Sequence, residues 1–569
     1  MRIDSLGATD HRVRLECGTR DTVSALLTTE PLTEPQTIPS RSRARALDWL
    51  ALLVTVMCTV AVCAPFFRYI QWFGDEGIVL NAADKILRGE RLYGDFFELL
   101  PPGSFLIGTA WMKLIGSSLA SIRVLAVGVI VAIAALTYVA TRMACRSPIL
   151  AAVLVVTWVV QSQGIRTVVS HHWFATAASM ASAVALLSAL ASVDNPAIRA
   201  AALRTRRDGA AAWLLAGLFA GITAMTMPPQ GAFLCLAALG LAATCPDRRR
   251  AIASVVGGAA VFPLASLAYL GATGSMAAAF YDTIVFPLRH YGRIEGVNFG
   301  AFAETHQLPA VVFLQLTFLL AGLAAVLERQ VLWREPVFRG ALALAVVAVP
   351  SVFPRPDVTH INFVLPLACP MFALATQRLL RRLERPTRRA VNVGLMALAA
   401  VIIGSASYAE IVPIVTGPLR PVSTARGVFH GPPSPWTEAV AALVRAIERT
   451  PPADGFFFYP HSPMLPYLTA RQHVAPIAVM VPGHTPAEQY REVCVRVIRD
   501  ARWVVIDRSW TEPLFLQEMF PNMRVLDPPE MREFEAAMRA AFDEVVHASA
   551  IYELRRRSRP VPDRTCGRI

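Results

Sequence analysis

The sequence predicts a polytopic α-helical membrane protein of about eleven spans, followed by a small extracytoplasmic α/β domain at the C-terminus. Of the 569 residues, 54% are hydrophobic and only 17% are Asp, Glu, Lys or Arg, and the mean hydropathy is +0.46. Soluble domains carry about 25% charged residues. Long apolar runs almost free of charge recur along the chain and give way to a soluble pattern from about Gly417. These observations exclude an ordinary cytosolic enzyme.

The net charge of +13 comes from Arg residues that gather in short clusters between the apolar runs. Because the clusters form no basic face interleaved with aromatic side chains, no nucleic-acid partner is expected. Loops rich in Lys and Arg stay in the cytoplasm, so the clusters instead orient the spans in a lipid bilayer. The nine Cys are scattered without a Cys-x-x-Cys pair or a metal-ligand spacing, and most are expected to be inert.

Residues 1–46 are polar, have mixed charge and lack the apolar core of a signal peptide. They are predicted to be a disordered cytoplasmic tail that the mature chain retains. The first span is expected from about Leu47 to Phe66, after a cluster of three Arg. The acid-rich segment that follows is predicted to lie outside the cytoplasm.

The segment Ser104–Ile115 is apolar, but it is only about a dozen residues long, whereas a span needs about 20. If it crossed the membrane, the Arg-rich loops that follow would all lie outside, so it is expected to lie flat on the outer leaflet as an amphipathic helix. The membrane domain covers 47–414, with outer loops at 67–119 and 272–307. The remaining spans are expected at about 120–141, 148–162, 170–191, 210–225, 229–244, 251–271, 308–327, 338–353, 361–379 and 390–414.

Residues 415–569 are predicted to form the extracytoplasmic domain. Strand-like stretches at Gly455–Tyr459, His473–Val479 and Trp503–Asp507 alternate with helices, the second of them at Ala487–Arg499. This alternation indicates a three-layer α/β arrangement. The stretch Arg555–Arg559 is expected to be a solvated, disordered tail.

The most informative motif is Phe73-Gly74-Asp75-Glu76-Gly77, which continues through Tyr93-Gly94-Asp95 to Pro101-Pro102-Gly103. Adjacent carboxylates at the exit of the first span, then a helix and a Tyr-Gly-Asp turn, resemble the first outer loop of the GT-C superfamily of membrane glycosyltransferases. That superfamily includes the protein O-mannosyltransferases and the transferases that put aminoarabinose or galacturonate on lipid A. The resemblance covers roughly residues 47–414. The motif is its specific part, and the rest of the likeness is architectural.

The resemblance implies a sugar donor carried on a polyprenyl phosphate at the outer face of the plasma (inner) membrane. The acceptor would be an envelope glycolipid, a polysaccharide or a protein. Asp75 matches the acidic residue that the family carries after the first span, which implies a general base that deprotonates the acceptor hydroxyl for an inverting displacement. Glu76, the second catalytic candidate, is expected rather to hold the loop or a metal. Asp95 either positions a substrate or forms an Asx turn.

A departing phosphate needs positive charge, and Arg suits it through bidentate contacts. Arg289 lies in the loop where members of the family place a phosphate-binding Arg. The sequence departs from the aminoarabinose transferases before the flat helix, where they carry a Lys and this chain has Leu100-Pro101-Pro102. The candidates on the outer side are Lys85, Arg88, Arg289, His290, Arg293, Arg355 and His360.

His171 and His172, beside Trp173, either bond a sugar or phosphate or belong to an interfacial anchor belt. No metal site and no obligatory cofactor is assigned, although the adjacent carboxylates leave a divalent cation open. Two other functions remain. A transporter or flippase of lipid-linked saccharide would need a polar path through the spans, where charges are sparse, and a non-catalytic envelope scaffold would not need the carboxylate pair.

Overall fold

The computed structural model describes residues 41–71, 73–164, 166–194, 206–292, 294–329, 334–560, 563–567 and 569. The chain divides into two units, Met1–Ala46 and Leu47–Ile569, and the contacts that build the site lie within the second. Of the tail predicted over residues 1–46, residues 1–40 lie outside the described residues, and helix α1 begins at Arg41.

The described residues contain eleven apolar helices, each close to a range that the sequence predicts. They are α1 (Arg41–Cys63), α4 (Leu119–Cys145), α5 (Pro148–Ser162), α6 (His171–Asp194), α8 (Arg206–Ala224), α9 (Pro228–Ala243), α10 (Arg248–Ala272), α12 (Leu308–Leu327), α14 (Pro336–Ser351), α15 (Val358–Arg381) and α16 (Arg385–Ala406). Seven are long and apolar enough to cross a membrane, whereas α5, α8, α9 and α14 are shorter. The chain is therefore a polytopic α-helical membrane protein.

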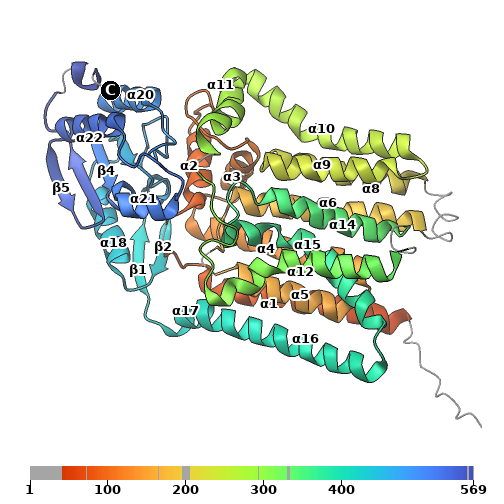
Figure 1. Cartoon of the computed structure of the whole chain (residues 1–569). Coiled ribbons are helices and arrows are strands. Elements are labelled where there is room, and N and C mark those ends of the chain that lie inside the picture. The colour runs from red at the N-terminus through yellow and green to blue at the C-terminus, as the bar shows by residue number, and fades with distance from the viewer. Residues whose placement is uncertain are drawn as a thin grey trace, which may run out of the picture. The chain divides into compact units, whose positions relative to one another are not determined.

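These helices run alongside one another as a bundle (Figure 1). Helix α15 is the most deeply buried of the seven long helices and α16 the least. The main core joins α15 to its neighbours through residues such as Leu367, Met371, Leu344 and Trp158. Helix α16 continues through a π-helical turn, η5 (Ser407–Ile411), into α17 (Val412–Thr416), and then leads to the C-terminal domain.

Two connections at the end of the bundle nearest the C-terminal domain carry structure of their own. The first contains η1 (Ala64–Phe66), α2 (Asp75–Leu87) and α3 (Gly103–Leu114). With 12 residues, α3 is too short to span, as expected, and its placement on a leaflet stays a prediction. The second connection, between α10 and α12, contains α11 (Met276–Phe280), the π-helices η2 (Tyr281–Val285) and η3 (Pro287–Tyr291), and η4 (Thr305–Gln307).

The C-terminal domain is built on a four-stranded sheet of order β3-β4-β6-β5, in which β3 and β4 are parallel and the other pairs antiparallel. Its strands are β3 (Phe456–Tyr459), β4 (Trp503–Asp507), β5 (Glu544–Ala548) and β6 (Tyr552–Arg556). A separate hairpin pairs β1 (Arg420–Thr424) with β2 (Gly427–Gly431). The helical elements are α18 (Pro435–Glu448), α19 (Met464–Thr469), α20 (Ala487–Asp500), η6 (Ser509–Thr511), α21 (Pro513–Met519), α22 (Pro529–Ala541) and η7 (Asp563–Cys566).

Side chains of each strand alternate between the two faces of this sheet. Phe456 and Phe458 face the core that contains Leu443 of α18, whereas Phe457 faces the core that contains Phe534 of α22. The strands expected at Gly455–Tyr459 and Trp503–Asp507 are present. The strand expected at His473–Val479 is wrong, because that segment makes only isolated bridges, at His473 and Val479.

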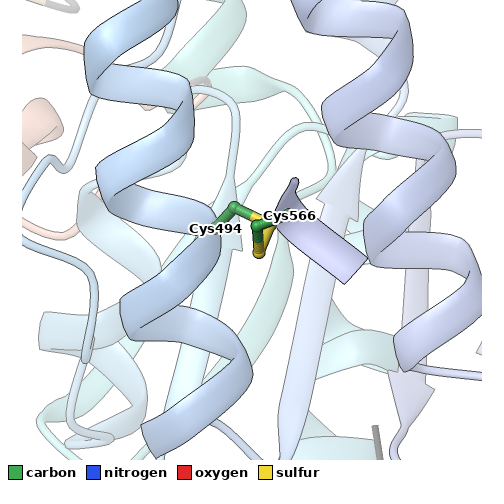
Figure 2. The surroundings of a disulfide bond; sticks show 2 residues. All are labelled: Cys494 and Cys566. Carbon is green, nitrogen blue, oxygen red and sulfur yellow. A yellow bond between two sulfur atoms is a disulfide. The ribbon is translucent and has the colours of Figure 1, made fainter. Parts of the chain in front are cut away.

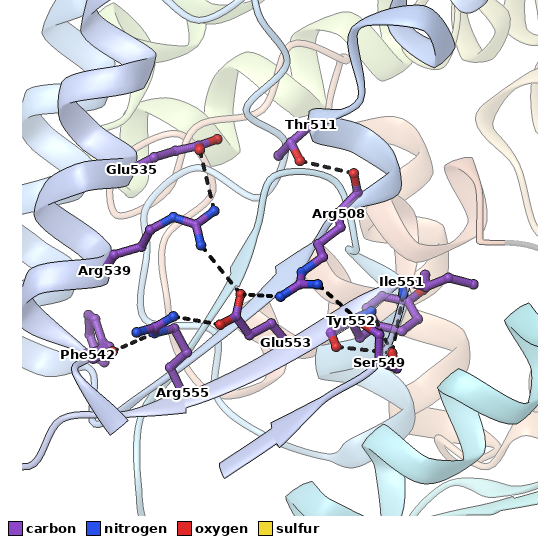
Figure 3. Close-up of polar contacts among 10 residues, drawn as sticks. All are labelled: Arg508, Thr511, Glu535, Arg539, Phe542, Ser549, Ile551, Tyr552, Glu553 and Arg555. Atoms are coloured by element: carbon purple, nitrogen blue, oxygen red, sulfur yellow. Dashed lines mark hydrogen bonds and ion pairs between the residues drawn. The ribbon is translucent and has the colours of Figure 1, made fainter. Parts of the chain in front are cut away.

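The expectation of a disordered Arg555–Arg559 tail is also wrong, because Arg555 and Arg556 belong to β6, inside the sheet. Arg555 Nη1 lies 2.6 Å from Oε1 of the buried Glu553. Arg508 and Arg539 approach the other oxygen of Glu553 at 3.1 and 3.5 Å (Figure 3). Both Arg of β6 are thus paired within the sheet, Arg555 with Glu553 and Arg556 with Glu544.

A disulfide bond joins Cys494 in α20 to Cys566 in η7 (Figure 2). It ties the chain near its last residues to a helix that packs against the sheet. These two Cys depart from the expectation of inert, scattered thiols. Six Cys in the described residues are free, and they lie at or before Cys369.

The C-terminal domain packs directly on α2. A Cβ atom placed on Gly77 would lie 2.3 Å from the backbone nitrogen of Met464, so only glycine permits this approach. Val79 and Leu80 of α2 share one core with Leu465 and Val440 of the C-terminal domain. The first connection and the C-terminal domain therefore form one packed structure.

Candidate functional site

The centre of the candidate site is Asp75, the first residue of α2. Gly74 before it has an extended backbone, and the helix begins with Asp75 and Glu76 in its first turn. Carboxylates are favoured there because the helix dipole leaves positive charge at the N-terminus. Asp75 is exposed, whereas Glu76 is buried. The adjacent carboxylates expected from the sequence therefore face different surroundings.

Glu76 is held inside the protein. Its Oε1 lies 2.6 Å from Nη1 of Arg123 in α4 and accepts a hydrogen bond from the backbone N–H of Val169 (3.1 Å). Arg123 also donates to the backbone oxygen of Thr167 (3.1 Å). This geometry suits a residue that positions the loop and gives Glu76 no direct place beside Asp75 as a second acid.

Two buried histidines lie next to Asp75. His171 and His172 open α6, and one ligand atom from each of these three residues lies within 4.8 Å of the other two. The centroids of the two imidazole rings are 3.9 Å apart. One carboxylate with two imidazoles is a donor set that suits a divalent transition metal. Both imidazoles are buried beside Asp75, and His172 stacks on Phe363 of α15 with ring centroids 4.5 Å apart.

A second carboxylate-histidine pair follows on α15. The ring of His360 lies 4.8 Å from that of His172, and its Nδ1 is 2.8 Å from Oδ1 of Asp357. The same oxygen caps α15 by accepting the backbone N–H of His360 (2.9 Å). Burial opposes the charge of Asp357, but the hydrogen bonds from His360 and the charge of Arg355 hold its pKa below the ordinary value.

Arg355 ties this pair to the second connection and to the C-terminal domain. It donates to Asp357 (3.0 Å), to Glu295 (2.9 Å) and to the backbone oxygen of Met519 (2.9 Å). Burial raises the pKa of Glu295, although the Arg355 charge opposes that shift. With all three guanidinium nitrogens engaged, Arg355 has little capacity left for a phosphate.

Two other parts of the chain approach Asp75. Burial raises the pKa of Tyr291, the last residue of η3, and the negative charges of Glu295 and Asp75 add to the shift. His461 comes from the C-terminal domain and stacks on Trp510 with centroids 3.9 Å apart. Burial lowers the pKa of His461 to about 4, although Asp75 opposes the shift, so His461 is neutral at physiological pH.

The other candidates lie in separate surroundings. Lys85 is buried at the far end of α2, where its Nζ donates to the backbone oxygen of Ala475 (2.9 Å). Asp95 accepts hydrogen bonds from the backbone N–H and the guanidinium of Arg91, four residues earlier, so this is not the Asx turn that the sequence left open. Neither contacts the residues around Asp75 in the described structure.

The second connection carries three of the predicted cations, Arg289, His290 and Arg293. Arg289 is exposed, and no carboxylate among the described residues lies within ion-pair distance of it. The ring of His290 packs against that of Phe286, with ring centroids 5.1 Å apart. Arg293 lies outside the described residues. Because Arg289 and His290 precede Tyr291, they lie on the segment that approaches Asp75.

The site therefore brings Asp75 together with histidines from three elements, and of the predicted cations it includes His360 and Arg355. From the sequence alone, the role of His171 and His172 stayed open, and Arg123, Glu295 and Asp357 were given no role. The sequence contains one signal for Arg123: an Arg inside an otherwise apolar span is costly unless it is paired.

The fold is similar to those of solved membrane glycosyltransferases. The oligosaccharyltransferase AglB from Archaeoglobus fulgidus, in complex with an inhibitory peptide and a dolichol-phosphate, aligns at a TM-score of 0.53 and 13% identity, over 86% of this chain and 72% of its own. ArnT from Cupriavidus metallidurans, bound to undecaprenyl phosphate, aligns at 0.52 and 12% identity, over 91% of this chain and 98% of its own. Both are GT-C proteins.

The chain has the GT-C fold. No protein-family model and no curated protein sequence matches it. The similarity is thus one of fold. The GT-C resemblance of the Asp75 motif, read from the sequence, agrees with the fold found for the whole chain.

Proposed function

We propose that this GT-C protein is a glycosyltransferase that moves a sugar from a polyprenyl-phosphate carrier to an acceptor outside the cytoplasm. The observation that carries the proposal is the setting of Asp75, an exposed carboxylate at the start of α2 beside His171 and His172. Two proteins of similar fold have structures with a lipid phosphate bound, dolichol-phosphate in one and undecaprenyl phosphate in the other.

In this mechanism, Asp75 accepts the proton of an acceptor hydroxyl, whose oxygen then attacks the anomeric carbon. The bond from that carbon to the lipid phosphate breaks, and the configuration at the carbon inverts. Neutral His461 can exchange hydrogen bonds with a sugar without adding a charge to the site. The pair Arg123 and Glu76 fixes the first turn of α2 and so holds Asp75 in place.

The leaving phosphate is assigned to Arg289, because that guanidinium is exposed and unpaired among the described residues. Arg355 and His360, expected from the sequence to share this task, instead bind Asp357 and Glu295. Their proposed role is to support the site. Arg293 and His290 stay predictions as further phosphate contacts.

Asp75, His171 and His172 also fit a divalent cation, because their ligand atoms converge and the donors are one carboxylate and two imidazoles. Such an ion would supply positive charge for the departing phosphate. Three carboxylates lie at this site, and among the described residues Arg355 pairs with two of them, Glu295 and Asp357, so added positive charge is favoured beside Asp75.

We propose that the C-terminal domain lies outside the cytoplasm and the N-terminus inside. The disulfide between Cys494 and Cys566 supports this orientation, since disulfides form and persist in oxidising compartments. The Arg clusters support it as well, because those at Arg142, Arg248–Arg250 and Arg378–Arg389 lie at the helix ends away from the C-terminal domain.

Sugar transfer from a defined polyprenyl-phosphate donor in proteoliposomes tests the proposal. The parent protein is expected to release lipid phosphate and glycosylate an acceptor added on the side of the C-terminal domain, and Asp75→Asn is expected to do neither. Movement of the intact lipid-linked saccharide across the bilayer, without transfer, would favour the transporter alternative.

A further inference from the structure

A cavity of about 330 Å³ lies in the C-terminal domain, apart from Asp75 and its neighbours. The last two turns of α18, the first residue of β4 and the edge strand β5 line it. Small-ligand sites in proteins have volumes of about 300–1,000 Å³, so the cavity has room for one sugar ring or a molecule of similar size.

Every ionisable side chain that lines the cavity is basic. They are Arg445, Arg449 and His547. Arg445 and Arg449 are one helical turn apart, and neither has a carboxylate within ion-pair distance among the described residues. Both Arg are exposed to solvent, and like charges at this spacing destabilise a helix by a few tenths of a kcal/mol. An anion between the two guanidiniums would relieve this repulsion.

His547 gives a second and independent indication of a ligand. Its Nε2 is buried and has no hydrogen-bond partner, although the residue lines the cavity. Because this atom has almost no accessible surface, a ligand hydroxyl reaches it only when the ring turns toward the cavity, and the bond then recovers the free energy that an unpaired buried atom costs. Ala446, Val546 and Trp503 supply an apolar wall. The Trp503 nitrogen is already bonded to Asp454 (2.8 Å), which fixes the ring in place.

We propose that this cavity binds an anionic sugar residue of an envelope glycan. The two guanidiniums would hold its carboxylate through paired hydrogen bonds, and His547 would bond a ring hydroxyl. The C–H face of the ring would pack on the apolar wall. A simple inorganic anion would satisfy only the first of these contacts, and a neutral sugar only the other two.

Isothermal titration of the full chain in lipid nanodiscs tests this, with glucuronate, glucose and inorganic phosphate as separate probes. Glucuronate is expected to bind at one site, at least about tenfold more tightly than either other probe. The double variant Arg445→Gln/Arg449→Gln should weaken glucuronate by about tenfold or more. Ala446→Phe, which fills the cavity without changing charge, should abolish binding.

The matched control is Arg524→Gln/Arg532→Gln, which removes the same charge from exposed positions that do not line the cavity. It should leave glucuronate affinity within about twofold, since screened surface charges contribute little. An equal loss in both double variants would overturn the proposal, and so would phosphate binding as tightly as glucuronate. Asp75→Asn should bind glucuronate like the parent, so failure of the catalytic proposal is seen separately.

Discussion

Arg123 and Glu76 form a buried ion pair, 2.6 Å between Nη1 and Oε1, that ties α4 to the first turn of α2. The same Glu76 oxygen accepts the backbone N–H of Val169, two residues before His171. One carboxylate therefore fixes two segments that meet at the site, the start of α2 and the approach to α6. The position of Asp75 relative to His171 depends on this pair.

Asp75→Asn keeps the size of the side chain but removes the proton acceptor. Sugar transfer is expected to fall by about 10²–10⁴-fold, the usual contribution of a general base. Thermal stability should stay near that of the parent, because Asp75 is exposed. Single-turnover transfer in proteoliposomes, with thermal unfolding of the same samples, measures both. Near-normal transfer would remove Asp75 as the base.

Glu76→Gln is the matched control, since it makes the same chemical change one residue later. It leaves the Arg123 guanidinium buried without a carboxylate, a loss of about 3–5 kcal/mol for a broken buried pair. The variant should therefore unfold at a clearly lower temperature. If Glu76→Gln were stable but inactive while Asp75→Asn stayed active, the base would be Glu76.

Arg289→Ala should weaken use of the lipid donor by roughly 10- to 150-fold, as expected for one charge-assisted contact. The unfolding temperature should not change, because Arg289 is exposed and unpaired among the described residues. Arg355→Ala serves as the comparison, because it strands the buried carboxylates of Glu295 and Asp357 and should destabilise the protein. The kinetics of donor use distinguish the two variants. If these kinetics were unchanged in Arg289→Ala, another residue would contact the leaving phosphate.

A divalent cation at Asp75, His171 and His172 makes a separate prediction. Chelation should lower transfer at least about tenfold, and Mn²⁺ should restore it in the parent. In His171→Ala/His172→Ala, the added metal should neither bind, as measured by elemental analysis of the dialysed protein, nor restore transfer. Full activity after complete chelation would leave the histidines a hydrogen-bonding role only.

The stability that burial of protonated Glu98 contributes should be lost as pH rises toward about 8. Burial raises the pKa of Glu98 to about 8; the charge of Lys85 opposes the shift and that of Asp282 adds to it. The folded state thus prefers the protonated acid, so its stabilising effect is complete below the ordinary pKa and is lost as pH rises through about 8. Thermal unfolding measured from about pH 5 to about pH 9 should show this loss of stability in the parent protein and a smaller loss in Glu98→Gln.

The orientation can be tested with a reporter that is active only outside the cytoplasm. Fused after Gly417 it should be active, and fused near Arg204 it should be silent, because the Arg-rich loops are expected to stay inside. The reverse pattern would place Asp75 on the cytoplasmic side and contradict a donor presented outside.

The membrane helices were predictable because lipid imposes one simple requirement on sequence. A span must be apolar over about 20 residues, and its flanking charges orient it, so local composition was enough to place the helices from α1 to α16. The motif around Asp75 was likewise local. The helix at Ser104–Ile115 was likewise recognisable from its length as too short to span.

Contacts between distant residues were not predictable in the same way. Glu76 pairs with Arg123, and Cys494 with Cys566, across separations that no spacing rule covers. Arg555 looked solvated because Arg usually is, yet Glu553 neutralises it within the sheet. The apolar run from His473 has the composition of a strand, but composition does not say whether a neighbouring strand offers a free edge to it.

The close contact between Gly77 and the backbone at Met464 forms only after both segments have been synthesised. Helix α2 leaves the ribosome before the backbone at Met464 that covers Gly77. Until that segment is synthesised, Val79 and Leu80 lack the partners of their shared core. The residues around Asp75 therefore reach their final arrangement only after the segment around Met464 has been made, so a protein truncated before the C-terminal domain would carry the Asp75 motif on an uncovered helix.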